Sequence, residues 1–162
     1  MTFADKQAIT NGVIAALRAE LDGFTRAAKA AQAAATDPDS KAENKYDTRN
    51  LEASYLARGV AFRLVETETA LAEWEAMPPQ DFSGMRPAGV GALVVLENQH
   101  GPAGYFIGPG GGGITVEHEG LEITVITAAS PLGRQLIKRQ EGSIFLMESG
   151  DRRLETVILS VC

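Results

Sequence analysis

Two long stretches with helical spacing, joined by a short connection, constrain the fold of this 162-residue chain more than any other feature. From about residue 5 to 35, and again from 42 to 77, apolar residues recur three, four or seven positions apart, as on one face of a helix. Pro78 and Pro79 end the second stretch. Helices of ~30 residues are ~45 Å long, and a short connection forces them to run antiparallel. The sequence therefore predicts a coiled-coil hairpin over residues 1–80, with its tip near 37–47.

The apolar stripe on each predicted helix identifies the residues expected to face the partner helix. Alanine is frequent in the first stripe, which favours close packing without strict heptads. The stripe residues are Ile9, Val13, Leu17, Phe24, Ala28 and Ala31 in the first helix, and Ala53, Leu56, Val60, Leu64, Leu71 and Trp74 in the second. Tyr46 and Tyr55 are also expected to pack against the first helix.

The pattern changes after residue 80 to short segments rich in Val, Ile and Phe that are separated by Gly, Asn or Asp. These segments are GALVVLEN, AGYFIG, GITVEHEG, LEITVITA, SIFLMES and LETVILSV. They predict a small antiparallel β domain over 81–162, so the fold class is α+β. One segment is helical, because Ser130 suits an N-cap, Pro131 suits the first helical position, and LGRQLIK follows.

Composition and charge exclude several classes of function. Twenty-one acids against fifteen Lys and Arg give a net charge of −6, which disfavours binding to naked nucleic acid. No basic leader and no apolar run of ~18 residues is present, so we expect a cytoplasmic protein with no membrane contact. Cys162 is the only cysteine, which excludes an intrachain disulfide and fits a reducing compartment. One cysteine and two histidines also exclude a Cys/His zinc site.

The connection between the predicted helices, DPDSKAENKYDT (37–48), is rich in acids. Asp39 and Glu43 are four residues apart, so on a helix their Cβ atoms lie ~6 Å apart on one face, a separation that suits one Mg²⁺ ion. The acids of this connection also have a structural explanation, in which they stabilise the start of the second helix. Ser40 and Glu43 match the S-x-x-E capping box, and an acid such as Asp37 is favoured by the helix dipole. Both interpretations stay open from the residues alone.

Two other features have ordinary structural explanations. The glycine run GPGGGG (108–113) lacks the Lys-Ser/Thr and the following helix of a phosphate-binding loop, so it predicts a flexible hairpin turn. His100 and His118 lie in or beside turn-like segments without a nearby nucleophile pattern. We expect both histidines at the surface.

Two segments resemble the Gre family of bacterial transcription elongation factors. ITVITAASPLGRQLIKRQEGSIF (123–145) is similar to the signature of the family's C-terminal domain, and SKAENKYDTRNLEASYLA (40–57) is similar to the start of the second hairpin helix, including the Glu43-Asn44 pair. The two halves also follow the family's order, so the resemblance extends over nearly the whole chain. It implies an FKBP-like topology for the β domain.

The resemblance implies binding to RNA polymerase, with the β domain at the rim of the secondary channel and the hairpin inside it. The tip acids would help to hold a Mg²⁺ ion shared with the polymerase, which then hydrolyses backtracked RNA. The chain would be no enzyme itself, would hold no cofactor in isolation, and would meet nucleic acid only within the polymerase complex. The residues implied as catalytic are Glu43 and Asp39, with Asp37 as a further metal ligand; those implied in polymerase binding are Asn44, Tyr46, Ser130, Pro131, Leu132, Gly133 and Arg134.

The tip departs from the cleavage-active pattern of the family at two positions. Ser40 stands where an acid is expected, and Asp39 is one residue earlier, a rotation of ~100° on a helix. Tyr46 follows Glu43 by three residues instead of four. One alternative is therefore a regulator that occupies the channel without cleavage.

Two further alternatives come from other classes of function. The first is an FKBP-like peptidyl-prolyl isomerase, which needs an aromatic-lined pocket. Its candidate aromatic residues are Phe82, Tyr105, Phe106 and Phe145. The second is a structural hairpin that dimerises through its alanine-rich face, although we expect a monomer.

Overall fold

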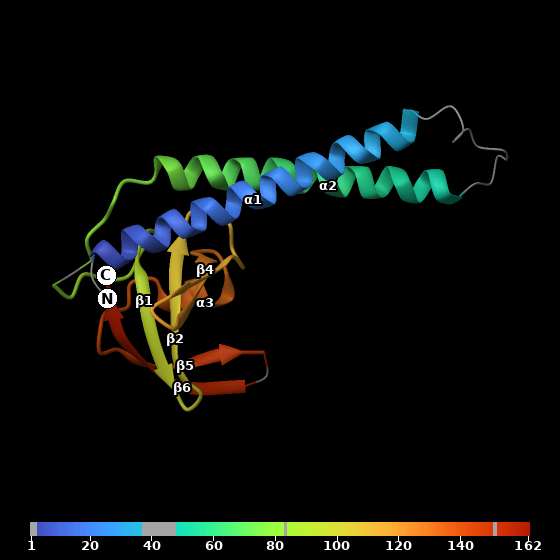
Figure 1. The fold of residues 1–162 in the computed structure, drawn as a ribbon. Helices are drawn as coiled ribbons and strands as arrows, with labels where there is room; N and C mark the ends of the chain where they lie inside the picture. Colours follow the sequence, from blue (N-terminus) through green and yellow to red (C-terminus); the bar gives the residue numbers. More distant parts are fainter. Residues whose placement is uncertain (1–2, 37–47, 83, 151) are drawn as a thin grey trace.

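The fold of the chain is α+β, as the sequence predicts. The computed structural model describes residues 3–36, 48–82, 84–150 and 152–162. Helices α1 (Phe3–Thr36) and α2 (Thr48–Ala76) lie side by side as an antiparallel pair, and the sheet and the short helix α3 (Pro131–Leu136) lie below one end of the pair (Figure 1). Within the described ranges, no helix is long and apolar enough to cross a membrane.

The two long helices agree with the predicted hairpin. At 1.5 Å per residue, α1 with 34 residues is ~51 Å long and α2 with 29 residues is ~44 Å long. Helix α2 ends at Ala76, just before Pro78 and Pro79, which cannot continue a helical hydrogen-bond ladder. The predicted start of the second helix at residue 42 falls outside the described residues.

The sheet has six strands in the order β3-β4-β2-β1-β6-β5. Their bounds are Leu93–Asn98 (β1), Gly101–Gly108 (β2), Thr115–His118 (β3), Leu121–Thr127 (β4), Ile144–Ser149 (β5) and Arg152–Val161 (β6). All neighbouring strands are antiparallel except β2 and β4, which are parallel, with Phe106 opposite Val125. The prediction of a purely antiparallel domain is wrong for this pair.

The parallel pair arises because β4 is inserted between β2 and β3. The prediction of a hairpin turn at 108–113 is wrong for the same reason, since β2 and β3 do not pair with each other. Burial explains which strand takes the inner place. Strand β4 carries the fully buried Ile123 and Val125, whereas β3 has no buried residue and can lie at the edge.

Each face of the sheet contributes to a separate hydrophobic core. One core lies between the sheet and α3 and includes Val94, Leu96, Ile107, Leu136 and Ile158. The other lies between the opposite face and the bases of the long helices. Its buried residues are Ile9, Val13, Leu17, Ala70, Trp74, Leu93, Phe106, Ile123 and Val125. This second core joins residues from both predicted domains, and the division at residue 80 stays a prediction.

Burial on the long helices ends partway along them. Among the described side chains, the last buried residue of α1 is Leu17 and the first of α2 is Thr67. Beyond these points the pair extends past the sheet (Figure 1). Leu56, predicted to face α1, is 68% exposed, and Tyr55 is 65% exposed. Two helices alone cover only one side of each other, so the distal stripe has no third surface to bury it.

Candidate functional site

The helices beyond Leu17 and Thr67, here called the arm, form the most distinctive surface of the molecule. At 1.5 Å per residue, residues 18–36 and 48–66 each extend for ~28 Å. The far end of the arm is where α1 ends and α2 begins (Figure 1). The acidic connection of the sequence therefore joins the two helices at the end that is remote from the sheet.

The residues assigned to the tip lie in this connection, outside the described residues. Their catalytic, metal-binding and polymerase-binding roles stay predictions, and so does the choice between Mg²⁺ binding and helix capping. These residues are Asp37, Asp39, Glu43, Asn44 and Tyr46.

The arm exposes several large apolar side chains on α2. Tyr55, Phe62 and Val65 are between 59% and 65% exposed. Tyr55 and Phe62 are seven residues apart, so they lie within ~20° of each other around the helix, and Val65 is about one turn further along. Large exposed apolar side chains that share a helix face are typical of a contact surface for a partner.

The Ser130 to Arg134 segment positions α3 against the sheet. Ser130 Oγ accepts a hydrogen bond from the Gly133 amide at 3.0 Å and donates one to the Thr127 carbonyl oxygen at 2.8 Å. The predicted N-cap is therefore confirmed. A Cβ atom on Gly133 would collide with the Thr127 carbonyl oxygen, so this position requires glycine.

The other residues of this segment differ in exposure. Leu132 packs against the core between the sheet and α3, and Arg134 donates a hydrogen bond to the Ala129 carbonyl oxygen. Pro131 and Arg134 are both exposed, so they are available to a partner. The predicted role of all five residues in polymerase binding stays a prediction.

Strands β5 and β6 carry an exposed apolar face that the sequence analysis did not identify. Ile144 and Leu146 alternate with the buried Phe145 and Met147, so they point to the opposite side of β5. Leu159 of β6 is also exposed, and it lies two residues beyond Val157, the partner of Ile144, where the register between β6 and β1 shifts. These three side chains are 67%, 57% and 43% exposed, and β5 is an edge of the sheet. The helices do not cover this end of the sheet (Figure 1).

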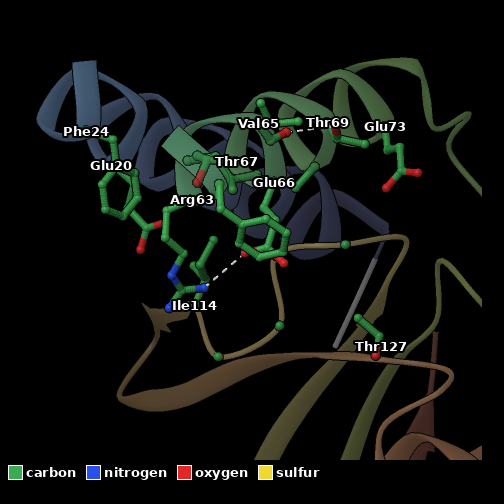
Figure 2. Close-up of a pocket in the computed structure, with 17 residues that line it drawn as sticks. Glu20, Phe24, Arg63, Val65, Glu66, Thr67, Thr69, Glu73, Ile114 and Thr127 are labelled. Carbon is green, nitrogen blue, oxygen red and sulfur yellow. Dashed lines mark hydrogen bonds and ion pairs between the residues drawn. The ribbon is translucent and has the colours of Figure 1, made fainter. Parts of the chain in front are cut away.

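A pocket of about 660 Å³ lies where the arm meets the body of the protein (Figure 2). It is bounded by α1, α2 and the glycine-rich loop, and Figure 2 shows Glu20, Glu66 and Glu73 around it. Among the described residues that line the pocket, Arg63 is the only basic one, and its guanidinium lies 3.4 Å from the Glu66 carboxylate. The excess of carboxylates repels phosphate, so the pocket does not support a phosphate-binding role for the glycines.

The glycine run has a packing role at this pocket. Trp74 Nε1 donates a hydrogen bond to the Gly110 carbonyl oxygen at 3.0 Å. A Cβ atom on Gly108 would collide with the Trp74 ring, and one on Gly110 would lie 3.0 Å from the Glu73 carboxylate. Glycine at these positions lets the loop approach α2 closely, and thereby fixes the base of the arm on the sheet.

The two histidines differ in their surroundings. His100 is exposed, as expected. His118 is not a free surface residue, because its side chain is only 21% exposed and its Nε2 atom lies 3.3 Å from Asp5 Oδ1. Asp5 and His118 are far apart in the sequence, and no motif joins them. The sequence analysis therefore missed this contact.

Lys6 is buried beneath the helix base, although lysine is rarely buried. Its ammonium group donates hydrogen bonds to the main-chain oxygens of Gln80 at 2.6 Å and Cys162 at 3.1 Å, and lies 4.7 Å from the centre of the Phe82 ring. Burial lowers the pKa of Lys6 from its ordinary value of 10.5. Lys6 thus links α1 to the final strand and to the segment that follows α2.

The aromatic pocket that a prolyl isomerase requires has no support among the described residues. Phe82, Phe106 and Phe145 are at most 7% exposed, because all three belong to the cores. Tyr105 is partly buried and packs against the core between the sheet and α3.

These features define an α+β protein in which a helical hairpin is anchored on a mixed sheet and extends beyond it. No protein-family model matches the chain, and no curated protein matches it. Solved structures with partial similarity include Gfh1, described as a transcription factor, with 15% identity, coverage of 91% of this chain and 92% of that chain, and a TM-score of 0.40.

Two further structures are similar at the same level. They are GreA factor homolog 1 (Gfh1) of Thermus thermophilus, with 17% identity, coverage of 92% and 94% and a TM-score of 0.38, and Gfh1 of Thermus aquaticus, with 15% identity, coverage of 90% and 90% and a TM-score of 0.38. A TM-score below 0.5 does not establish a common fold. The proposals below therefore rest on the residues of this chain.

Proposed function

We propose that this protein is an RNA polymerase-binding transcription factor whose arm enters a channel of the polymerase. The observation that carries the proposal is the ~28 Å length of paired helix beyond the last buried residues, Leu17 and Thr67. Among the described side chains, the part of the helices beyond these two residues adds no buried residue to the core. A narrow extension of two helices can, however, reach a site that the body of the protein cannot enter.

Two kinds of observation connect the arm to this partner. The exposed Tyr55, Phe62 and Val65 supply apolar area for contact with the wall of a channel. The resemblance of residues 40–57 and 123–145 to the Gre family supports RNA polymerase as the proposed partner. The net charge of −6 fits a protein that meets nucleic acid only inside such a complex.

The exposed face formed by Ile144, Leu146 and Leu159 is the proposed contact of the body with the polymerase surface. Apolar side chains at the centre of an interface contribute more binding energy than exposed charges at its rim. Docking of this face at the mouth of the channel would leave the arm free to extend inward. Pro131 and Arg134 are also exposed and are proposed as additional contacts.

The proposed action at the far end of the arm is metal delivery. Glu43 and Asp39, with Asp37 as a further ligand, would share a Mg²⁺ ion with the polymerase and position the water that attacks backtracked RNA. The polymerase supplies the active site in this scheme. The chain acts as a cofactor of its hydrolytic activity, and holds no Mg²⁺ of its own in isolation.

A second candidate is a regulator that occupies the channel without promoting cleavage. The observation that favours it is Ser40, which stands where the cleavage-active pattern has an acid. The two candidates share the partner and the arm, and differ only in what the tip does.

Binding is tested with the full chain and core RNA polymerase in a direct affinity measurement. We expect saturable binding at micromolar concentrations or below, weakened about tenfold or more by the double substitution Tyr55→Ser and Phe62→Ser. The matched control is Met85→Ser, because Met85 is 67% exposed but lies outside the arm. Absence of binding by the unmodified protein would refute the proposed function.

The action of the tip is tested with a backtracked elongation complex and Mg²⁺. If the tip delivers metal, the unmodified protein accelerates RNA cleavage and Glu43→Ala abolishes the acceleration while polymerase binding persists. If the tip only occupies the channel, the unmodified protein binds without accelerating cleavage, and Ser40→Asp creates activity. Equal cleavage with the unmodified protein and with Glu43→Ala would remove the tip from the mechanism.

A further inference from the structure

A cluster of three potential metal ligands lies near the start of α1, at the opposite end of this helix from the far end of the arm. Asp5 is in the first turn of α1, His118 is the last residue of β3, and Glu119 begins the turn to β4. One ligand atom from each side chain lies within 4.8 Å of each of the other two. Two segments that are distant in the sequence, the start of α1 and the end of β3 with the turn after it, therefore present one imidazole nitrogen and two carboxylates to a common point.

The contacts of His118 leave this point unexplained by hydrogen bonding alone. Its Nε2 atom is buried and makes no hydrogen bond, although Asp5 Oδ1 is only 3.3 Å away. When its lone pair is free, an imidazole nitrogen beside carboxylate oxygens is an electron-pair donor facing other donors. A cation between these atoms changes the repulsion into attraction.

We propose that Asp5, His118 and Glu119 bind one Zn²⁺ ion. Ligands ~2.0–2.1 Å from a tetrahedral zinc ion are ~3.3–3.4 Å from each other, which is the separation of His118 Nε2 and Asp5 Oδ1. Glu119 is exposed, so its carboxylate can close onto the ion by a side-chain rotation, and water can occupy the fourth position.

The set of donors favours zinc over the Mg²⁺ that is proposed at the tip. Magnesium and calcium prefer oxygen ligands alone, whereas an imidazole with carboxylates suits the later first-row divalent metals. The site also differs from the Cys/His zinc sites that the composition excludes, because it uses no cysteine. It is independent of polymerase binding, so either proposal can fail without the other.

The expected consequence of the ion is a link between the arm and the sheet. Helix α1 packs against β3 next to the site, where a Cβ atom on Gly12 would lie 2.9 Å from Val116. A zinc ion that joins Asp5 to the turn between β3 and β4 would restrain the start of α1. Because metal binds only the folded arrangement, it would also stabilise the fold.

The test is a titration of the full, metal-free chain with Zn²⁺ by calorimetry, together with thermal unfolding. We expect one Zn²⁺ per chain and a higher Tm. We expect Co²⁺ in its place to show the intense visible absorption of tetrahedral coordination. His118→Ala should weaken Zn²⁺ binding at least tenfold. His100→Ala, which changes the other, exposed histidine, should leave it unchanged.

Two further variants separate this cluster from other acids and from effects on folding. Glu119→Gln preserves the shape of the side chain, removes its charge and lies on an exposed turn, so it should fold normally and weaken binding about tenfold. Glu43→Gln alters the tip and should have no effect on Zn²⁺ binding. No saturable binding by the unmodified chain, or equal binding by His118→Ala and Glu119→Gln, would overturn the proposal; the pair of atoms at 3.3 Å would then be an ion pair that requires only a proton.

Discussion

Trp74 provides the sharpest test of how the arm is anchored. It is 1% exposed, its ring contacts Phe106 edge to face with centroids 5.0 Å apart, and its indole N–H donates to the Gly110 carbonyl oxygen. Replacing Trp74 with alanine removes all of these interactions and leaves a cavity between α2 and the sheet. Substitutions of a buried aromatic residue by alanine cost ~3–5 kcal/mol, a large part of the ~5–15 kcal/mol by which a domain is stable.

A graded series divides this cost into its parts. Trp74→Phe keeps an aromatic ring in the core but loses the hydrogen bond, which contributes ~0.5–1.5 kcal/mol, and some of the packing on Gly108. We therefore expect a loss of ~1–3 kcal/mol for Trp74→Phe and ~3–5 kcal/mol for Trp74→Ala. The control is Phe62→Ala, since Phe62 is 65% exposed and its removal should change stability by ~0.5 kcal/mol or less.

The assay is urea unfolding at equilibrium, followed by far-ultraviolet circular dichroism for the helices and by backbone amide NMR signals for the sheet. Because Trp74 and Phe106 share one core, we expect both probes to report a single transition. The urea midpoint should be lower for Trp74→Phe than for the unmodified protein, and lower again for Trp74→Ala. A loss below ~1 kcal/mol for Trp74→Ala, or separate transitions for helices and sheet in the unmodified protein, would refute the anchored arrangement.

Two glycines and one lysine give further predictions. Gly133→Ala places a Cβ atom against the Thr127 carbonyl oxygen, so it should lower the free energy of unfolding by ~1–3 kcal/mol. Gly59 lies in open space on α2, so Gly59→Ala should raise the free energy of unfolding by ~0.5–1 kcal/mol. Urea unfolding measures both changes, and a change of the same sign for both variants would contradict this account. The pKa of Lys6 is lowered in the fold, so between that pKa and 10.5 the unfolded chain binds more protons and stability rises with pH. Lys6→Met should lose this alkaline gain, so the urea midpoints of the two proteins should change relative to each other as the pH rises toward 10.5; midpoints that stay parallel would count against a lowered pKa of Lys6.

The elements of the fold followed closely from local sequence signals. Apolar spacing and the Pro78-Pro79 pair located both long helices and the end of the second. Ser130 and Pro131 located the start of α3, because an N-cap side chain and a proline at the first helical position act within one turn. Interactions of this range depend only on neighbouring residues, so they can be predicted without knowledge of the rest of the chain.

Pairing between distant strands could not be read in the same way. The alternating patterns of β2, β3 and β4 identify each as a strand, but do not say that β4 lies between the other two. That order depends on which strand buries more apolar area under the helices, and the buried Ile123 and Val125 decide it in favour of β4. The sequence predicted a hairpin turn at the glycine run. The close approach of this run to Trp74 depends on the position of α2, so the sequence could not indicate it.

The functional surfaces divide along the same line. The sequence by itself determined that a long helical hairpin carries an acidic connection, and that a β domain follows it, because these features depend on periodicity, charge and turn residues. Only the tertiary structure decided where the helices leave the core, which face of β5 and β6 stays uncovered, and that Asp5 meets His118 and Glu119. The physical reason is that exposure and ligand geometry depend on contacts between segments far apart in the chain, and no local pattern encodes those contacts.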